Sequence, residues 1–196
     1  MRPAVYQKEP FARGARLCND APGKKAMPEF RVEHTFNCSE ETFWSKIFFD
    51  ADYNRRLFLE RLKFAGWKET KNEERDGKVH RVVEAIPPIG DLPSALKSVV
   101  GEGAGYEEKG VLDRASNRYT AEVTPNRLAD KISVRVELST VADGPNRCKR
   151  IAKGSVNVKI FGVGGLLEKK MIADLEKSYT KSAEFTNEFV KEKNLT

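Results

Sequence analysis

The chain has 196 residues, of which 39% are hydrophobic and 33% are charged. A chain of this length suits one domain and buries roughly 70% of its unfolded surface, so a hydrophobic core can stabilise it. Mean hydropathy is −0.57, and no apolar run approaches the ~18 residues of a membrane span. The 11 Phe, 5 Tyr and 2 Trp argue against a disordered chain.

The net charge of +6 is concentrated at the amino terminus. Residues 1–28 hold six basic and two acidic side chains, whereas the remaining residues hold 29 basic and 27 acidic ones. Because phosphate backbones are bound by clustered Lys and Arg, this near balance predicts no nucleic-acid partner.

The cysteines and histidines do not form a metal-binding pattern. Cys18, Cys38 and Cys148 are far apart, and only His34 and His80 are available to join them. A structural zinc site needs four ligands at short paired spacings. We therefore expect no metal and no cofactor, and reduced thiols favour a cytoplasmic location.

The first 28 residues are predicted to be a basic, disordered leader. They lack the continuous apolar stretch of a secretory signal. Two alternatives stay open: translation begins at Met27, or residues 1–26 form an organellar transit peptide.

From Glu29 onward the sequence has clear periodicity. Phe30, Val32, His34 and Phe36 alternate with polar residues, which predicts a half-buried strand over residues 29–36. Further elements follow in chain order. Helices are predicted over residues 40–48, with Ser39 as the cap, and 51–62; strands over 67–74, 78–86, 106–113, 118–124, 131–141 and 147–161; and a final helix over 166–193.

Strands and helices kept apart in this order indicate an α+β fold. A curved antiparallel sheet has one apolar face to cover, and the long final helix is the element able to cover it. We therefore expect the final helix to cover the apolar face of the sheet.

Three segments resemble the START-like (SRPBCC, helix-grip) superfamily: residues 30–62, 91–97 and 154–179. The combination is similar to a bacterial branch of unknown-function domains, and the run from Glu168 to Tyr179 is similar, less completely, to VASt domains. The resemblance covers residues 29–193, so one START-like domain is expected over residues 29–196.

The resemblance implies a curved antiparallel sheet wrapped around the long carboxy-terminal helix, with a deep hydrophobic cavity between the two. Its expected role is to bind or carry a hydrophobic small molecule such as a lipid, sterol or polyketide, with transient membrane contact. A cyclase- or hydrolase-like enzyme using the same cavity is the alternative, although no catalytic residue is carried over. The candidate cavity wall comprises His34, Val83, Leu96, Tyr119, Val134, Val136, Val156, Val158, Met171, Leu175 and Tyr179.

Two features leave alternatives open. Four charged residues of the strands either enter the cavity or face solvent, and the cost of unpaired burial favours solvent; they are Arg81, Glu84, Arg118 and Glu122. The long connection over residues 87–105 is predicted to hold a short helix after Pro93. Such a segment acts as a mobile gate or as a static cap.

Overall fold

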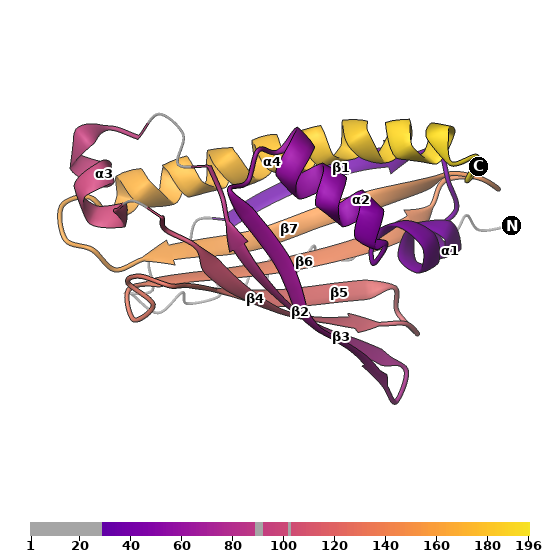
Figure 1. Ribbon diagram of the computed structural model, residues 1–196, viewed down its shortest axis with the longest axis horizontal. Helices are drawn as coiled ribbons and strands as arrows, with labels where there is room; N and C mark the ends of the chain where they lie inside the picture. The colour runs from indigo at the N-terminus through magenta and orange to yellow at the C-terminus, as the bar shows by residue number, and fades with distance from the viewer. Residues whose placement is uncertain (1–28, 89–91, 102) are drawn as a thin grey trace, which may run out of the picture.

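The computed structural model describes residues 29–88, 92–101 and 103–196. The expectations for residues 1–28 lie outside the described residues. Figure 1 shows one curved sheet with a long helix lying across it. None of the described helices is both long and apolar enough to cross a bilayer.

The sheet has seven strands, paired antiparallel in the order β1-β7-β6-β5-β4-β3-β2. The strands are β1 (Glu29–Phe36), β2 (Gly66–Arg75), β3 (Lys78–Ile86), β4 (Tyr106–Asp113), β5 (Arg118–Pro125), β6 (Ile132–Ala142) and β7 (Cys148–Val158). Asp76 and Gly77, with φ of 51° and 71°, form the tight β2–β3 turn. The α+β class and the curved sheet expected from the sequence are confirmed.

The helices are α1 (Glu40–Thr42), η1 (Phe43–Ile47), α2 (Ala51–Arg55), η2 (Arg56–Arg61), α3 (Ser94–Val100) and α4 (Gly164–Glu192). The Ser39 hydroxyl accepts a hydrogen bond from the Thr42 amide at 3.1 Å, which confirms the predicted cap. The segments η1 and η2 are π-helical, whereas the sequence predicts plain helices. In η1 the Phe48 amide donates to the Phe43 carbonyl at 2.9 Å, which widens the turn.

The two halves of α4 contribute differently to the core. In the carboxy-terminal half, a continuous stripe is buried: Ser182, Ala183, Phe185, Thr186, Phe189 and Val190. In the amino-terminal half, only Gly164, Leu167 and Glu168 are buried. The helix packs on β1 and β7, as Figure 1 shows.

The connection from β7 to α4 differs from the prediction. Strand β7 ends at Val158, and α4 begins at Gly164. A Cβ on Gly164 would lie 2.6 Å from the Val158 carbonyl oxygen, so only glycine allows this close approach. Phe161, predicted to be in the strand, is instead 104% exposed.

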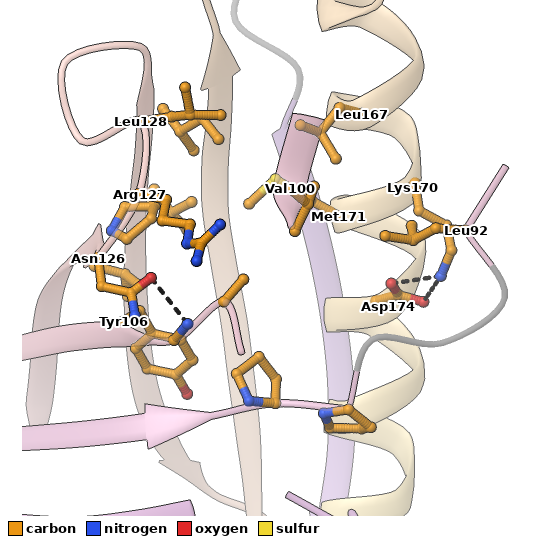
Figure 2. Close-up of a pocket in the computed structure, with 18 residues that line it drawn as sticks. Leu92, Val100, Tyr106, Asn126, Arg127, Leu128, Leu167, Lys170, Met171 and Asp174 are labelled. Carbon is orange, nitrogen blue, oxygen red and sulfur yellow. Dashed lines mark hydrogen bonds and ion pairs between the residues drawn. The ribbon is translucent and has the colours of Figure 1, made fainter. Parts of the chain in front are cut away.

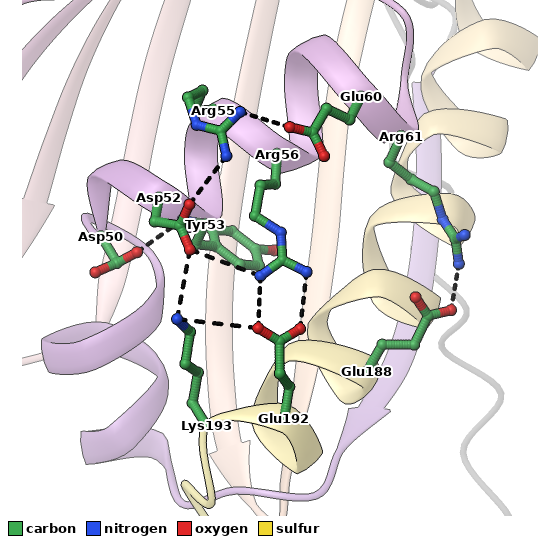
Figure 3. Close-up of polar contacts among 10 residues, drawn as sticks. All are labelled: Asp50, Asp52, Tyr53, Arg55, Arg56, Glu60, Arg61, Glu188, Glu192 and Lys193. Atoms are coloured by element: carbon green, nitrogen blue, oxygen red, sulfur yellow. Dashed lines mark hydrogen bonds and ion pairs between the residues drawn. The ribbon is translucent and has the colours of Figure 1, made fainter.

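Ion pairs hold the carboxy-terminal half of α4 against α2 and η2 (Figure 3). The Arg56 guanidinium donates to both carboxylate oxygens of Glu192 at 2.8 Å. Lys193 lies 3.5 Å from Asp52, and Arg61 pairs with Glu188. We call these six residues the α2–α4 clamp.

Candidate ligand site

A cavity of about 180 Å³ lies beneath the amino-terminal half of α4, between that helix, α3 and the ends of β4, β5 and β6 (Figure 2). Its walls are mainly apolar. The lining residues are Pro87, Pro88, Leu92, Val100, Ala104, Gly105, Tyr106, Val123, Pro125, Asn126, Arg127, Leu128, Ile132, Val134, Leu167, Lys170, Met171 and Asp174. Hence the cavity occupies the region that the sparsely buried half of α4 leaves unfilled.

The charged residues of the cavity belong to two different elements. On α4, the Lys170 ammonium binds both carboxylate oxygens of Asp174 at 2.5 Å. On the β5–β6 connection, the Arg127 guanidinium lies against Gly101, where a Cβ would be 2.3 Å from Arg127 Nη1. Gly101 has φ of 74°, a left-handed conformation that favours glycine. This contact joins the end of α3 to the opposite wall.

A buried polar cluster lies close to Tyr106. The Arg81 guanidinium is 3.3 Å from Glu108 Oε1, and the Tyr119 hydroxyl donates to the same oxygen at 2.6 Å. Arg81 also stacks over the rings of Phe48, 4.5 Å from the ring centre, and of Tyr119, at 5.2 Å. A paired and stacked guanidinium is stabilised in a core where a free one would not be.

Gly110 makes the cluster possible. A Cβ at this position would lie 1.7 Å from the Tyr119 hydroxyl oxygen. Because β4 pairs with β5 so that Gly110 faces Ala121, the absent side chain leaves space for the Tyr119 ring. The hydroxyl is thereby directed to Glu108.

The position of Arg81 corrects one expectation from the sequence. The side chain faces inward and is buried, whereas the cost of an unpaired charge had favoured solvent. Glu108 offsets part of that cost. It lies on another strand, where sequence spacing gives no sign of the pairing. Glu84, Arg118 and Glu122 are exposed as expected, and the last two pair with Glu137 and Arg135.

Two tyrosines between the sheet and α4 are only half-buried by their accessible surface. Tyr106 and Tyr179 each retain accessible surface, yet burial raises the pKa of both hydroxyls far above the ordinary value. The charge of Glu108 raises both pKa values further. Of the two, Tyr106 lines the cavity, and Tyr179 lies farther along α4, where its ring stacks on Phe30.

A second buried cation lies farther along α4. Arg150 donates to the Ser182 hydroxyl and to the Tyr179 carbonyl, both at 2.8 Å, and lies 3.2 Å from His34 Nδ1. Among the described residues no carboxylate pairs with it. Burial lowers the pKa of Arg150, and burial together with the Arg150 charge lowers the pKa of His34.

Of the wall residues predicted from the sequence, Val134 and Met171 line the cavity. Leu175 and Tyr179 are half-buried on α4, and His34 lies beside Arg150. The others are buried in the core: Val83, Leu96, Tyr119, Val136, Val156 and Val158.

Sequence reasoning missed the polar members of the site. Tyr106, Glu108, Gly110 and Leu112 share the inner face of β4, because strand residues alternate between faces. Two adjacent acids, Glu107 and Glu108, obscure this alternation. The glycine at 110, within a strand, was the available signal of a close approach.

Neither metal ligands nor a disulfide occur in the part of the chain that the structure describes. No three His, Cys, Asp or Glu side chains come together there in a way that could hold a metal ion. Cys38 and Cys148 are buried, and both are free thiols.

Comparison with known proteins gives one family and one fold. The model of a family described as "Protein of unknown function (DUF2505)" matches residues 31–190. No curated protein matches the chain in sequence.

Solved structures share the architecture at low sequence identity. An aromatase/cyclase, ZhuI, from Streptomyces sp. R1128 has a TM-score of 0.59 and 11% identity, with 84% of this chain and 94% of that chain covered. Norcoclaurine synthase from Thalictrum flavum, in complex with dopamine and hydroxybenzaldehyde, has a TM-score of 0.56 and 16% identity, covering 88% and 95%. An uncharacterised protein from Bacillus thuringiensis has a TM-score of 0.51 and 11% identity, covering 82% and 97%. At these identities the likeness establishes the helix-grip fold alone.

Proposed function

The chain belongs to the DUF2505 family of proteins of unknown function, and from this premise we propose that it binds a small, mostly apolar molecule between α4 and the sheet. The observation that carries the proposal is the apolar cavity beneath the amino-terminal half of α4. A concave, largely apolar site with a few polar groups is the usual form of a ligand pocket.

The volume of the cavity limits the size of the ligand that it can hold. Its volume of about 180 Å³ is below the roughly 300–1,000 Å³ of sites for drug-sized ligands. It is near the ~150 Å³ of an engineered cavity that binds benzene. A one-ring molecule or a short acyl chain therefore fits, whereas a sterol or a multi-ring polyketide requires α3 to move outward.

The fold neighbours support this proposal by analogy. One is named an aromatase/cyclase, and another was solved with dopamine and hydroxybenzaldehyde, which are one-ring compounds. Carriage of a lipid or polyketide-like ligand, transient membrane contact and a cytoplasmic location remain predictions within the same proposal. So does the similarity to VASt domains.

Enzymatic turnover in the same cavity is the second candidate. The observation that favours it is the half-buried carboxylate of Glu108, which accepts a hydrogen bond from the Tyr119 hydroxyl. A positioned carboxylate and phenol are able to move protons to and from a bound substrate.

Titration calorimetry with ethylbenzene tests the binding proposal. We expect saturable binding to the wild-type protein, and loss of that binding in Met171→Trp, because the indole fills the cavity that Met171 lines. Lys181→Trp is the matched control, since Lys181 is exposed on the same helix, and it should bind as the wild type does. Failure of the wild-type protein to bind ethylbenzene and its one-ring analogues alike would contradict the proposal.

A further inference from the structure

One carboxylate oxygen of Glu108 accepts two hydrogen bonds, and the other accepts none from the described residues. Arg81 and the Tyr119 hydroxyl both bind Oε1. Within the described part of the chain no hydrogen bond reaches Oε2, and this atom is not sealed off, because the Glu108 side chain is 21% exposed. A carboxylate oxygen has room for further hydrogen bonds, so Oε2 is an available acceptor.

This acceptor lies next to the cavity wall. Tyr106 lines the cavity, and Glu108 is the next residue on the same inner face of β4. The charge of Glu108 acts on both Tyr106 and Tyr179, one on the sheet and one on α4. Glu108 therefore lies one inner-face position beyond a residue of the cavity wall.

From this arrangement we propose that Glu108 Oε2 accepts a hydrogen bond from a hydroxyl group of the bound ligand, and that the ligand is an uncharged one-ring phenol or a similarly small alcohol. The inference rests on the proposed function and adds the chemical class of the ligand. In this arrangement the apolar cavity walls contact the ring of the ligand, and the hydroxyl group of the ligand points towards Glu108 on β4.

The charge of Glu108 disfavours an anionic group at Oε2. A carboxylate ligand would place a second negative charge beside Glu108, and like charges at such a distance repel. A cationic amine would join two buried guanidinium groups, Arg81 and Arg150. Since Arg81 already balances Glu108, a neutral hydrogen-bond donor is the group that the site accommodates.

Arg81, Tyr119 and Gly110 act as positioning residues. Arg81 and Tyr119 fix the carboxylate by binding Oε1 from two sides, which leaves Oε2 turned to the ligand. Gly110 provides the space for the Tyr119 hydroxyl. A receptor group held in this way loses little freedom on binding, which favours affinity.

The test compares 4-ethylphenol, 4-ethylanisole and ethylbenzene by titration calorimetry. These probes share the ring and the ethyl group, but only the phenol has a hydrogen-bond donor. In the wild-type protein we expect the phenol to bind about tenfold more tightly than either analogue, because hydrogen bonds to charged groups are among the stronger ones.

Variants locate the effect on one side chain. In Glu108→Gln the preference for the phenol should fall to within about threefold, while ethylbenzene affinity stays as in the wild type. Glu107→Gln is the matched control, because Glu107 lies on the outer face of the same strand and should keep the full preference. The three wild-type affinities remain decisive even when Glu108→Gln does not fold.

The outcomes separate this inference from the proposed function. Equal affinity for all three probes overturns the inference and leaves the binding proposal intact. A phenol preference that persists in folded Glu108→Gln also overturns it. Failure of every probe to bind the wild-type protein overturns both.

Discussion

The two halves of α4 lie on the same sheet but have different roles: one packs into the core, and the other borders the cavity. The carboxy-terminal half buries Phe185, Phe189 and Val190, and the α2–α4 clamp covers it. The amino-terminal half buries few side chains and borders the cavity. One continuous helix thus combines a packed anchor with a loosely filled site, and the boundary lies near Tyr179.

The difference between the two halves shows how a small domain can contain a cavity and still have a stable native state. Burial of apolar side chains stabilises the native state in proportion to the area removed from water. Because most of that burial is in the carboxy-terminal half of α4, the amino-terminal half can be less tightly packed and leave room for a ligand. Stability and binding should therefore respond to different residues of the same helix.

Truncating a buried ring in the carboxy-terminal half of α4 should destabilise the protein most. Phe189→Ala should lower the free energy of unfolding by about 3–5 kcal/mol, because it removes a buried ring that packs on Tyr53 and Phe185. Met171→Ala should cost less than about 2 kcal/mol, since Met171 is half-buried and borders a cavity. Urea denaturation measures both; equal losses would refute the division of α4.

A smaller effect is expected from crowding the polar cluster. Gly110→Ala should destabilise the protein by about 1–3 kcal/mol, because the new methyl group overlaps the Tyr119 hydroxyl. Gly165→Ala is the control: nothing lies within 4 Å of its Cβ position, so it should be neutral or stabilise the helix by up to about 1 kcal/mol. Thermal unfolding compares the two, and a neutral Gly110→Ala would show that Tyr119 moves aside freely.

The smallest effect concerns pH and the α2–α4 clamp. Hydrogen bonds from Arg55 lower the pKa of Asp52, and those from Arg56 lower the pKa of Glu192. A carboxyl whose folded pKa is lowered stabilises the protein above its unfolded pKa and loses this contribution as pH falls through the folded value. Wild-type stability should therefore decline as pH drops below the ordinary carboxyl range.

Urea midpoints at pH 7 and pH 3 measure that decline. The double variant Asp52→Asn, Glu192→Gln should show a smaller decline than the wild type. Glu41→Gln serves as the control, since Glu41 is exposed and outside the ion pairs of the described residues. An unchanged decline in the double variant would mean that the clamp does not hold α4.

Alternation and capping were sufficient to predict the frame of the molecule. The inward set of Phe30, Val32 and Phe36 defined β1, and the Ser39 cap defined the start of α1. These signals are local, so a single sequence contains them. The resemblance to helix-grip proteins then supplied the arrangement of sheet and helix.

The chemistry of the site could not be predicted in the same way. Arg81 and Glu108 are 27 positions apart, and their pairing depends on the register between β3 and β4. The π-helical turns of η1 and η2 have the same apolar spacing as short α-helices. Sequence patterns predict which face is buried, whereas side-chain pairing across strands requires coordinates.

The pairing of β1 with β7 has a consequence for how the chain folds. Glu29 lies opposite Ser155, so the first strand of the sheet must wait for the last one to arrive. Contacts between such distant positions slow folding, because a long loop must close before these two strands pair. During synthesis the edge of β1 stays unpaired until most of the domain has left the ribosome. The order of assembly is thus set by topology, with closure of the sheet as a late event.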